Sequence, residues 1–162
     1  MIIVGYQGIG KSTLSGTNNC IDLESGNFWV DGKRADDWYK PYCQIANHLS
    51  EQGYTVFTSS HEVVRKELEK SNEKVFVVFP AINLKDEWVA KLRERYEATN
   101  LEKDFKALAN AEDRYKENIS ELMMCNLKFY EITNMNYKLN SIINFLKNYE
   151  ETLCYQMKLL KY

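Results

Sequence analysis

Glycines, a lysine and a serine crowd the loop that follows the apolar start of the chain. The segment MIIVGYQGIGKST has the spacing G-x-x-x-x-G-K-S, formed by Gly5, Gly10, Lys11 and Ser12, with Gly8 between the glycines and Thr13 after the serine. Glycines here let the backbone fold closely and turn several N–H groups to one side, which suits an anion. A helix that starts near Lys11 adds the positive end of its dipole. The spacing therefore predicts a phosphate-binding loop.

The pattern is that of a Walker A motif, in which the polar residues have separate tasks. We expect Lys11 to bridge the β- and γ-phosphates of ATP, and the Ser12 hydroxyl to hold Mg²⁺. A dinucleotide loop of the form G-x-G-x-x-G is disfavoured, because Thr13 stands where the third glycine would be. The residues predicted to surround the nucleotide are Gly5, Gly8, Ile9, Gly10, Lys11, Ser12 and Thr13.

The length and composition favour one soluble domain. A chain of 162 residues can bury a substantial core, so we expect residues 1–162 to form a single domain. The net charge of −2 disfavours long nucleic acids as partners, since proteins that bind them are usually basic. No apolar run approaches the roughly 18 residues that a membrane span needs. The four cysteines are widely separated, so we expect free thiols and a cytoplasmic location.

Strand and helix patterns alternate along the chain. Strands are predicted at 1–4, 20–23, 54–58, 75–79 and 129–132. A short helix is predicted to start near Lys11, and a longer one to start at Asp36 or Asp37 and stop at Gly53. Further helices are predicted at 59–70, 84–96, 101–125 and 137–160. Ser59 with Glu62 forms a capping box pattern, and Asn83 is a predicted N-cap. This order predicts an α/β fold with a parallel sheet, helices on both faces, and a ligand site at the carboxyl ends of the strands.

The motif G-Y-Q-G-I-G-K-S-T and this element order resemble the P-loop small-molecule and nucleoside monophosphate kinases, which include adenylate, shikimate and gluconate kinases. The resemblance implies a three-layer P-loop NTPase fold with five parallel strands in the order 2-3-1-4-5. It also implies a mobile helical lid that supplies arginines, here expected at about residues 84–125. The chain departs from the family in three places. Its first helix is short, Thr58-Ser59-Ser60 stands where an acid would follow strand three, and the lid has no obvious R-x-x-x-x-x-R spacing.

Two carboxylates stand near the end of the second predicted strand. Asp22 and Glu24 alternate with Ile21 and Leu23, so both lie on one face. In the similar kinases this strand end supplies an acid to the Mg²⁺ shell or to the acceptor. We therefore expect Asp22 to serve the metal or to orient the acceptor, with Glu24 as a second acceptor residue. An exposed carboxylate pair without a function is the alternative.

Aromatic residues and cations follow the second strand. The aromatics predicted to contact the substrate are Phe28, Trp29 and Trp38, and the cations beside them are Lys33, Arg34 and Lys40. Such a mixture suits a base that stacks and an anion that is held, and it also suits plain core packing.

Four arginines are candidates for contact with phosphates, namely Arg65, Arg93, Arg95 and Arg114. Arg65 lies one turn after His61 on a helix that begins at a strand end, so it could reach an acceptor phosphate, with a solvated arginine as the alternative. In the predicted lid, Arg95 and then Arg93 are the candidates for neutralising charge on the transferred phosphoryl group. A solvated charged helix face is the alternative for both.

The sequence thus predicts an ATP-dependent kinase that transfers the γ-phosphoryl group to a small acceptor. A nucleoside monophosphate is favoured, because the aromatic residues suit a base. A nucleotide-binding regulatory module with weak ATPase activity and a protein partner is the first alternative. A nucleic-acid end kinase is the second, and the acidic net charge counts against it. Neither the preference for ATP over GTP nor the oligomeric state follows from the sequence.

Overall fold

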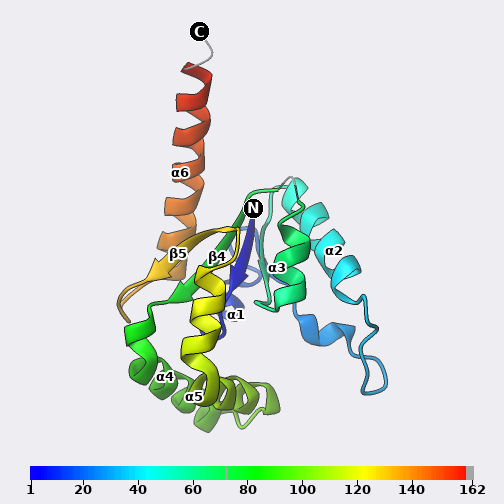
Figure 1. The fold of residues 1–162 in the computed structure, drawn as a ribbon, viewed down its shortest axis with the longest axis vertical. Helices are drawn as coiled ribbons and strands as arrows, with labels where there is room; N and C mark the ends of the chain where they lie inside the picture. The colour runs from blue at the N-terminus through cyan, green and yellow to red at the C-terminus, as the bar shows by residue number, and fades with distance from the viewer. Residues whose placement is uncertain (72, 160–162) are drawn as a thin grey trace.

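The protein contains a five-stranded, all-parallel sheet with helices around it (Figure 1). The computed structural model describes residues 1–71 and 73–159, with side chains described up to 149. The strands are β1 (Ile2–Gly5), β2 (Cys20–Asp22), β3 (Thr55–Thr58), β4 (Val75–Pro80) and β5 (Lys128–Ile132). Their order is β2-β3-β1-β4-β5, and each neighbouring pair is parallel. The predicted α/β class and strand order 2-3-1-4-5 are confirmed.

The three central strands are covered on both faces. Every residue of β1, β3 and β4 is buried, which matches their continuous apolar or β-branched sequences. β5 forms one edge of the sheet, and its first residues Lys128 and Phe129 are exposed while Ile132 is buried. Because β1 lies between β3 and β4, the loop after Gly5 emerges at the centre of the carboxyl edge.

Among the described residues, six α-helices and two short 3₁₀ helices lie between the strands or, in the case of α6, after the last strand. The α-helices are α1 (Lys11–Leu14), α2 (Tyr39–Glu51), α3 (Glu62–Leu68), α4 (Lys85–Thr99), α5 (Glu102–Met123) and α6 (Leu139–Leu159). The 3₁₀ helices are η1 (Ser25–Phe28) and η2 (Ile82–Leu84). α2 and α3 lie side by side, α4 and α5 form a helical hairpin, and α6 projects away from the sheet (Figure 1).

Both predicted helix caps are wrong. The N-cap residue of α3 is His61, because the chain stays non-helical through Ser59 and Ser60, and the Ser59 hydroxyl lies 2.9 Å from Nδ1 of His61. Asn83 is not a cap because it lies inside the 3₁₀ turn that precedes α4, where the Leu84 N–H donates to the Ala81 carbonyl. Helix α2 also begins later than predicted, at Tyr39.

Cys20, Cys43 and Cys125 are free thiols, as expected for widely separated cysteines. Cys154 lies outside the residues whose side chains are described, and the predicted helix end at Leu160 lies outside the described chain. None of the described helices combines the length and the apolar character that crossing a membrane would require.

Tyr42 of α2 joins the carboxyl ends of β2 and β3. Its side chain is buried, its hydroxyl donates to the Leu23 carbonyl at 2.6 Å, and it accepts from the Ser59 N–H at 2.9 Å. Burial raises the pKa of Tyr42 to about 12, so the hydroxyl keeps its proton at neutral pH. One phenol therefore satisfies two backbone groups beside the strand ends that carry Asp22 and Ser59.

Tyr42→Phe should lower the free energy of unfolding by about 1–3 kcal/mol, because it leaves two partly buried backbone groups without their partner. Urea denaturation followed by circular dichroism measures this change. Tyr39→Phe on the same helix is the matched control, since Tyr39 is only half-buried. Equal stability of the two variants would contradict the role assigned to the Tyr42 hydroxyl.

Candidate functional site

The glycine-rich loop (Gly5–Gly10) connects β1 to α1 and packs beneath α4. Gly8 has φ +84°, and a Cβ there would lie 2.9 Å from Cδ2 of Leu92 and 3.1 Å from Nε1 of Trp88. The Trp88 indole N–H donates to the Gln7 carbonyl at 3.0 Å. Gly8 is therefore required both by its backbone conformation and by the close approach of α4.

Lys11 folds back over the ends of two strands. Its Nζ donates to the Gly5 carbonyl at 2.8 Å and to the Thr58 carbonyl at 3.4 Å. A Cβ on Gly5 would lie 2.6 Å from Cδ1 of Ile9 and 2.8 Å from Cδ of Lys11, so a side chain at this position would displace both of them. Burial lowers the pKa of Lys11, while the nearby acids oppose that shift. No carboxylate of the described residues lies within ion-pair distance of the ammonium, which leaves its charge available to an anion.

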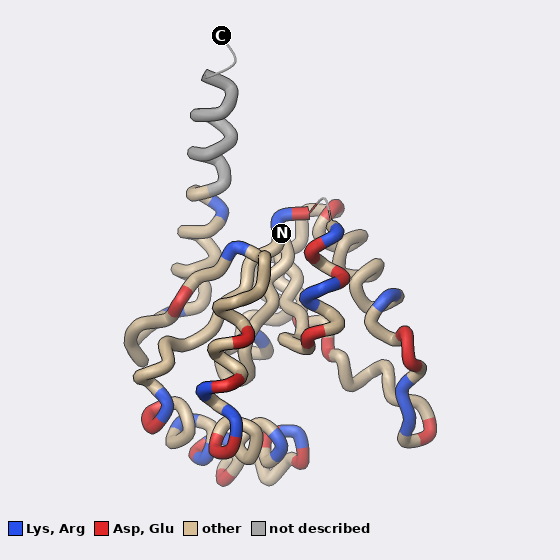
Figure 2. Tube along the Cα trace, viewed as in Figure 1, with Lys and Arg blue, Asp and Glu red and all other residues tan. Residues whose placement is uncertain are grey.

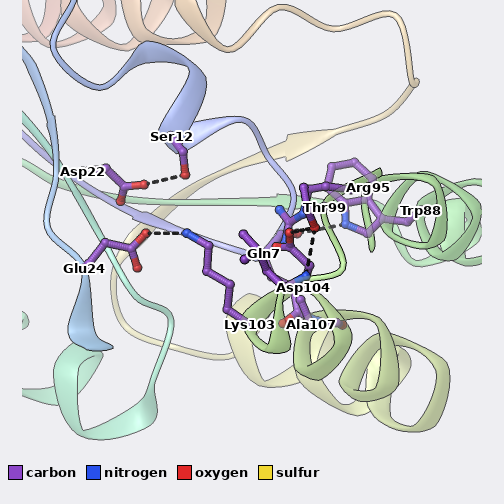
Figure 3. Close-up of polar contacts among 11 residues, drawn as sticks. Gln7, Ser12, Asp22, Glu24, Trp88, Arg95, Thr99, Lys103, Asp104 and Ala107 are labelled. Carbon is purple, nitrogen blue, oxygen red and sulfur yellow. Dashed lines mark hydrogen bonds and ion pairs between the residues drawn. The ribbon is translucent and has the colours of Figure 1, made fainter. Parts of the chain in front are cut away.

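Ser12 and Asp22 meet beside Lys11, as the sequence analysis requires of a shared metal site. The Ser12 hydroxyl donates to Oδ2 of Asp22 at 3.0 Å (Figure 3). Burial raises the pKa of Asp22, against the lowering effects of Lys11 and of the Ser12 hydrogen bond. The described residues contain no group of three or more His, Cys, Asp or Glu side chains arranged to hold a metal. A hydroxyl with one carboxylate still suits Mg²⁺, which usually takes one or two protein oxygens together with phosphates.

A cleft of about 880 Å³ opens in front of these residues. From the loop and α1, its lining includes Gly8, Gly10, Lys11, Ser12 and Thr13. From α4 and α5, it includes Lys91, Arg95, Lys103, Asp104 and Lys106. Charges of both signs lie along these two helices (Figure 2), but lysines and arginines outnumber acids on the wall of the cleft. Such a cleft attracts phosphate groups.

Arg95 faces the cleft and is held by Asp104. Nη2 of Arg95 lies 2.6 Å from Oδ1 of Asp104, whose other oxygen accepts from the Thr99 hydroxyl at 2.5 Å (Figure 3). Asp104 is only 3% exposed, whereas the Arg95 side chain is 41% exposed. The carboxylate therefore connects the turn between α4 and α5 to the arginine that reaches the cleft.

Two further contacts connect α5 to the other wall. Nζ of Lys103 lies 3.5 Å from Oε1 of Glu24, and the Gln7 side chain donates to the Ala107 carbonyl at 2.7 Å (Figure 3). Glu24 and Asp22 both line the cleft, as predicted for carboxylates near the end of β2. The helical hairpin thus lies against the loop and partly across the cleft.

Arg65 lies in a smaller cavity of about 300 Å³ that also includes Lys11. Its side chain is buried, donates to the Ser60 carbonyl, and lies 3.7 Å from Glu121 of α5. The alternative of a solvated arginine is therefore wrong. The guanidinium is already engaged by these two partners, so Arg65 connects α3 to α5 near the cleft.

The structure does not bring the other predicted residues to the cleft. The rings of Phe28, Trp29 and Trp38 do not line it; Phe28 packs 5.4 Å from Tyr42. Arg93 points to another side of α4, where Nη2 lies 2.6 Å from Glu112. The Ile9 side chain is buried in the core, which leaves only its backbone for a ligand. Packing therefore corrects the predictions for the three aromatic rings and for Arg93, whereas the backbone of Ile9 stays available to a ligand.

The sequence pattern does not indicate the contacts of Gln7, Asp104 and Lys103. Gln7 occupies a variable position of the Walker A spacing, and its partner Ala107 lies in a distant helix. Asp104 and Lys103 belong to a charged helical run in which no spacing distinguishes them from solvated residues. No local signal could have identified them.

Neither a scan of protein-family models nor a search of curated proteins found a match to this chain.

Asp104→Asn should lower the free energy of unfolding by about 1–3 kcal/mol, because a buried carboxylate loses charge-assisted bonds to Arg95 and Thr99. Glu112→Gln is the matched control. It breaks the Arg93 pair, which has the same 2.6 Å distance but is exposed, so its effect should stay below about 1 kcal/mol. Chemical denaturation compares the two, and an equal loss would contradict the structural difference drawn here.

Proposed function

We propose that this protein is an ATP-dependent phosphotransferase of the P-loop kinase type. The observation that carries the proposal is the placement of Lys11 and the Ser12–Asp22 pair. Lys11 lies over the carboxyl ends of β1 and β3, Asp22 ends the neighbouring strand β2, and all three residues line a cleft rich in cations. This is where parallel α/β sheets bind their ligands.

In this proposal the backbone N–H groups from Gly8 to Thr13 bind the nucleotide phosphates, and Lys11 contacts the β- and γ-phosphates. Ser12 and Asp22 would hold Mg²⁺ together with the phosphates, and the ion supplies charge neutralisation at the transferred group. Arg95 faces the same cleft and contributes further positive charge. The α4–α5 hairpin takes the place of the lid, with Arg93 on its outer side.

The acceptor is a small molecule that enters beside Glu24 and His61 on the opposite side of the cleft from Arg95. A nucleoside monophosphate belongs to this class. The aromatic residues no longer favour a base, however, because their rings lie outside the lining of the cleft. The acceptor must therefore be assigned from the polar groups that remain.

A regulatory module that binds ATP and hydrolyses it slowly is the second candidate. It is favoured by the end of β3, where Lys11 contacts the Thr58 carbonyl and Thr58-Ser59-Ser60 provides no acid. It is also favoured by the contacts of Lys103 and Gln7 that hold α5 against the loop. This candidate predicts ATP binding with little turnover until a protein partner is present.

The two candidates are separated by incubating the protein with γ-labelled ATP, Mg²⁺ and a panel of nucleoside monophosphates, sugars, hydroxy acids and polynucleotide ends. Labelled product is the result expected of a kinase. Lys11→Ala should reduce transfer by about 100-fold or more, because it removes a positive charge that stabilises the transferred phosphoryl group in the transition state. Lys40→Ala, an exposed lysine outside the cleft, is the control. ATP binding without labelled product would favour the regulatory module.

Metal dependence tests the Ser12–Asp22 pair separately. A chelator should abolish transfer, and Ser12→Ala or Asp22→Asn should raise the Mg²⁺ concentration for half-maximal rate by about 10–100-fold. Glu112→Gln, which lies outside the cleft, should leave this concentration unchanged. An unchanged requirement in Asp22→Asn would show that this carboxylate does not serve the metal.

A further inference from the structure

Arg34 differs from every other arginine of the chain in its partners. Each of the other four lies within ion-pair distance of a carboxylate: Arg65 and Arg114 of Glu121, Arg93 of Glu112, and Arg95 of Asp104. Among the residues that the structure describes, no carboxylate lies at this distance from Arg34. Its positive charge is therefore not compensated by a direct ion pair within the described chain.

Two tryptophans and one backbone carbonyl hold the Arg34 guanidinium. Its central carbon lies 4.2 Å from the ring centroid of Trp38 and 5.0 Å from that of Trp29. Nη2 donates to the Ser25 carbonyl at 2.8 Å and contacts the Ser25 hydroxyl at 3.3 Å. Contacts on the ring faces fix the plane of the guanidinium without using its N–H donors. The group is thus oriented before any ligand binds.

One donor of this oriented group has no partner. Nε of Arg34 is buried, and within the described part of the chain it makes no hydrogen bond. A buried N–H without an acceptor is unfavourable, and more so in a charged group. Phosphate and carboxylate oxygens match the planar donor arrangement of a guanidinium. An anion bound beside Arg34 in the cleft would compensate this charge.

The position of Arg34 connects this anion site to the proposed reaction. Arg34 lines the same cleft as Lys11, on the wall that also carries Glu24, Ser25 and Gly26. Arg95 and Lys91 lie on the α4 side of that cleft, so cations are available at two separate places. One place suits the nucleotide phosphates near the glycine-rich loop, and the other is left for a second anionic group.

We propose that Arg34 binds an anionic group on the acceptor, so that the acceptor is a phosphate- or carboxylate-bearing molecule. Trp29 and Trp38 hold this arginine in place and do not stack a base. That the ligand is a phosphoryl acceptor rests on the proposed phosphotransferase function. The anion site itself can be tested by binding measurements alone. The proposal predicts that neutral sugars and free nucleosides bind weakly to this wall of the cleft.

Binding is measured by calorimetry and by tryptophan fluorescence, since two of the three tryptophans contact Arg34. The probes are nucleoside monophosphates, sugar phosphates and hydroxy acids, each compared with its neutral counterpart, in the presence of a non-hydrolysable ATP analogue. We expect an anionic probe to bind at least tenfold more tightly than its counterpart and to change the fluorescence. The phosphate and carboxylate series distinguish the two sources of the charge.

Arg34→Gln should weaken binding of the anionic probe by about 10–100-fold, as expected for the loss of charge-assisted hydrogen bonds. Arg34→Lys keeps the charge without the planar donors and should give a smaller loss. Lys33→Gln removes the same charge from an exposed neighbour in the same loop and should have little effect. Affinity for the ATP analogue and thermal stability should stay near those of the unmodified protein.

The proposal is overturned if neutral counterparts bind as tightly as the anions, or if no anionic probe binds. It is also overturned if Arg34→Gln lowers stability and ATP affinity without a selective loss of the probe, because Arg34 would then be only structural. Arg34-dependent anion binding without labelled product would support the site and count against the kinase. Transfer to a neutral acceptor that Arg34→Gln does not change would support the kinase and overturn the site.

Discussion

The position of the Lys11 ammonium is the constraint on which the rest of the site depends. It lies over the carboxyl ends of β1 and β3, where it donates to the Gly5 and Thr58 carbonyls. This geometry requires adjacent parallel strands whose ends meet at one edge, and Gly5 leaves space beside them for the Lys11 side chain. The sequences of the central strands provide the parallel arrangement, because continuous apolar or β-branched runs are typical of parallel strands covered on both faces.

The charge distribution of the cleft has an energetic cost that a ligand can offset. Six lysines and arginines line it against three acids, and burial lowers the pKa of Lys11 while it raises that of Asp22. Like charges held close together in a partly buried cleft repel one another. Nucleotide phosphates would compensate the excess positive charge. The same argument explains why Asp104 is buried beside Arg95, since it neutralises one of these cations.

The aromatic residues after β2 have a different role from the one that their composition suggests. Phe28 and Trp38 pack with Tyr42, and Trp38 also contacts Arg34 and His61. This cluster connects η1 to α2 and to the residues after β3, so it supports the wall of the cleft from behind. The polar groups on that wall, rather than ring faces, are left for a ligand. The same packing therefore accounts for the positions of the aromatic rings and of Arg34.

The sequence by itself determined the glycine-rich loop, the five strands and their parallel arrangement, because these depend on local spacing, apolar runs and the alternation of elements along the chain. The resemblance to P-loop kinases, together with the place of Asp22 at the end of the second strand, also led to the expectation that Asp22 shares a metal site with Ser12. Only the tertiary structure decided which cations face the cleft. Arg93 and Arg95 are two positions apart on α4 and point to different sides, and the packing of α4 on Gly8 and α5 selects Arg95. The contacts of Arg34 and Asp104 likewise join segments that no local pattern relates, because side-chain partners across a fold are set by how whole elements pack.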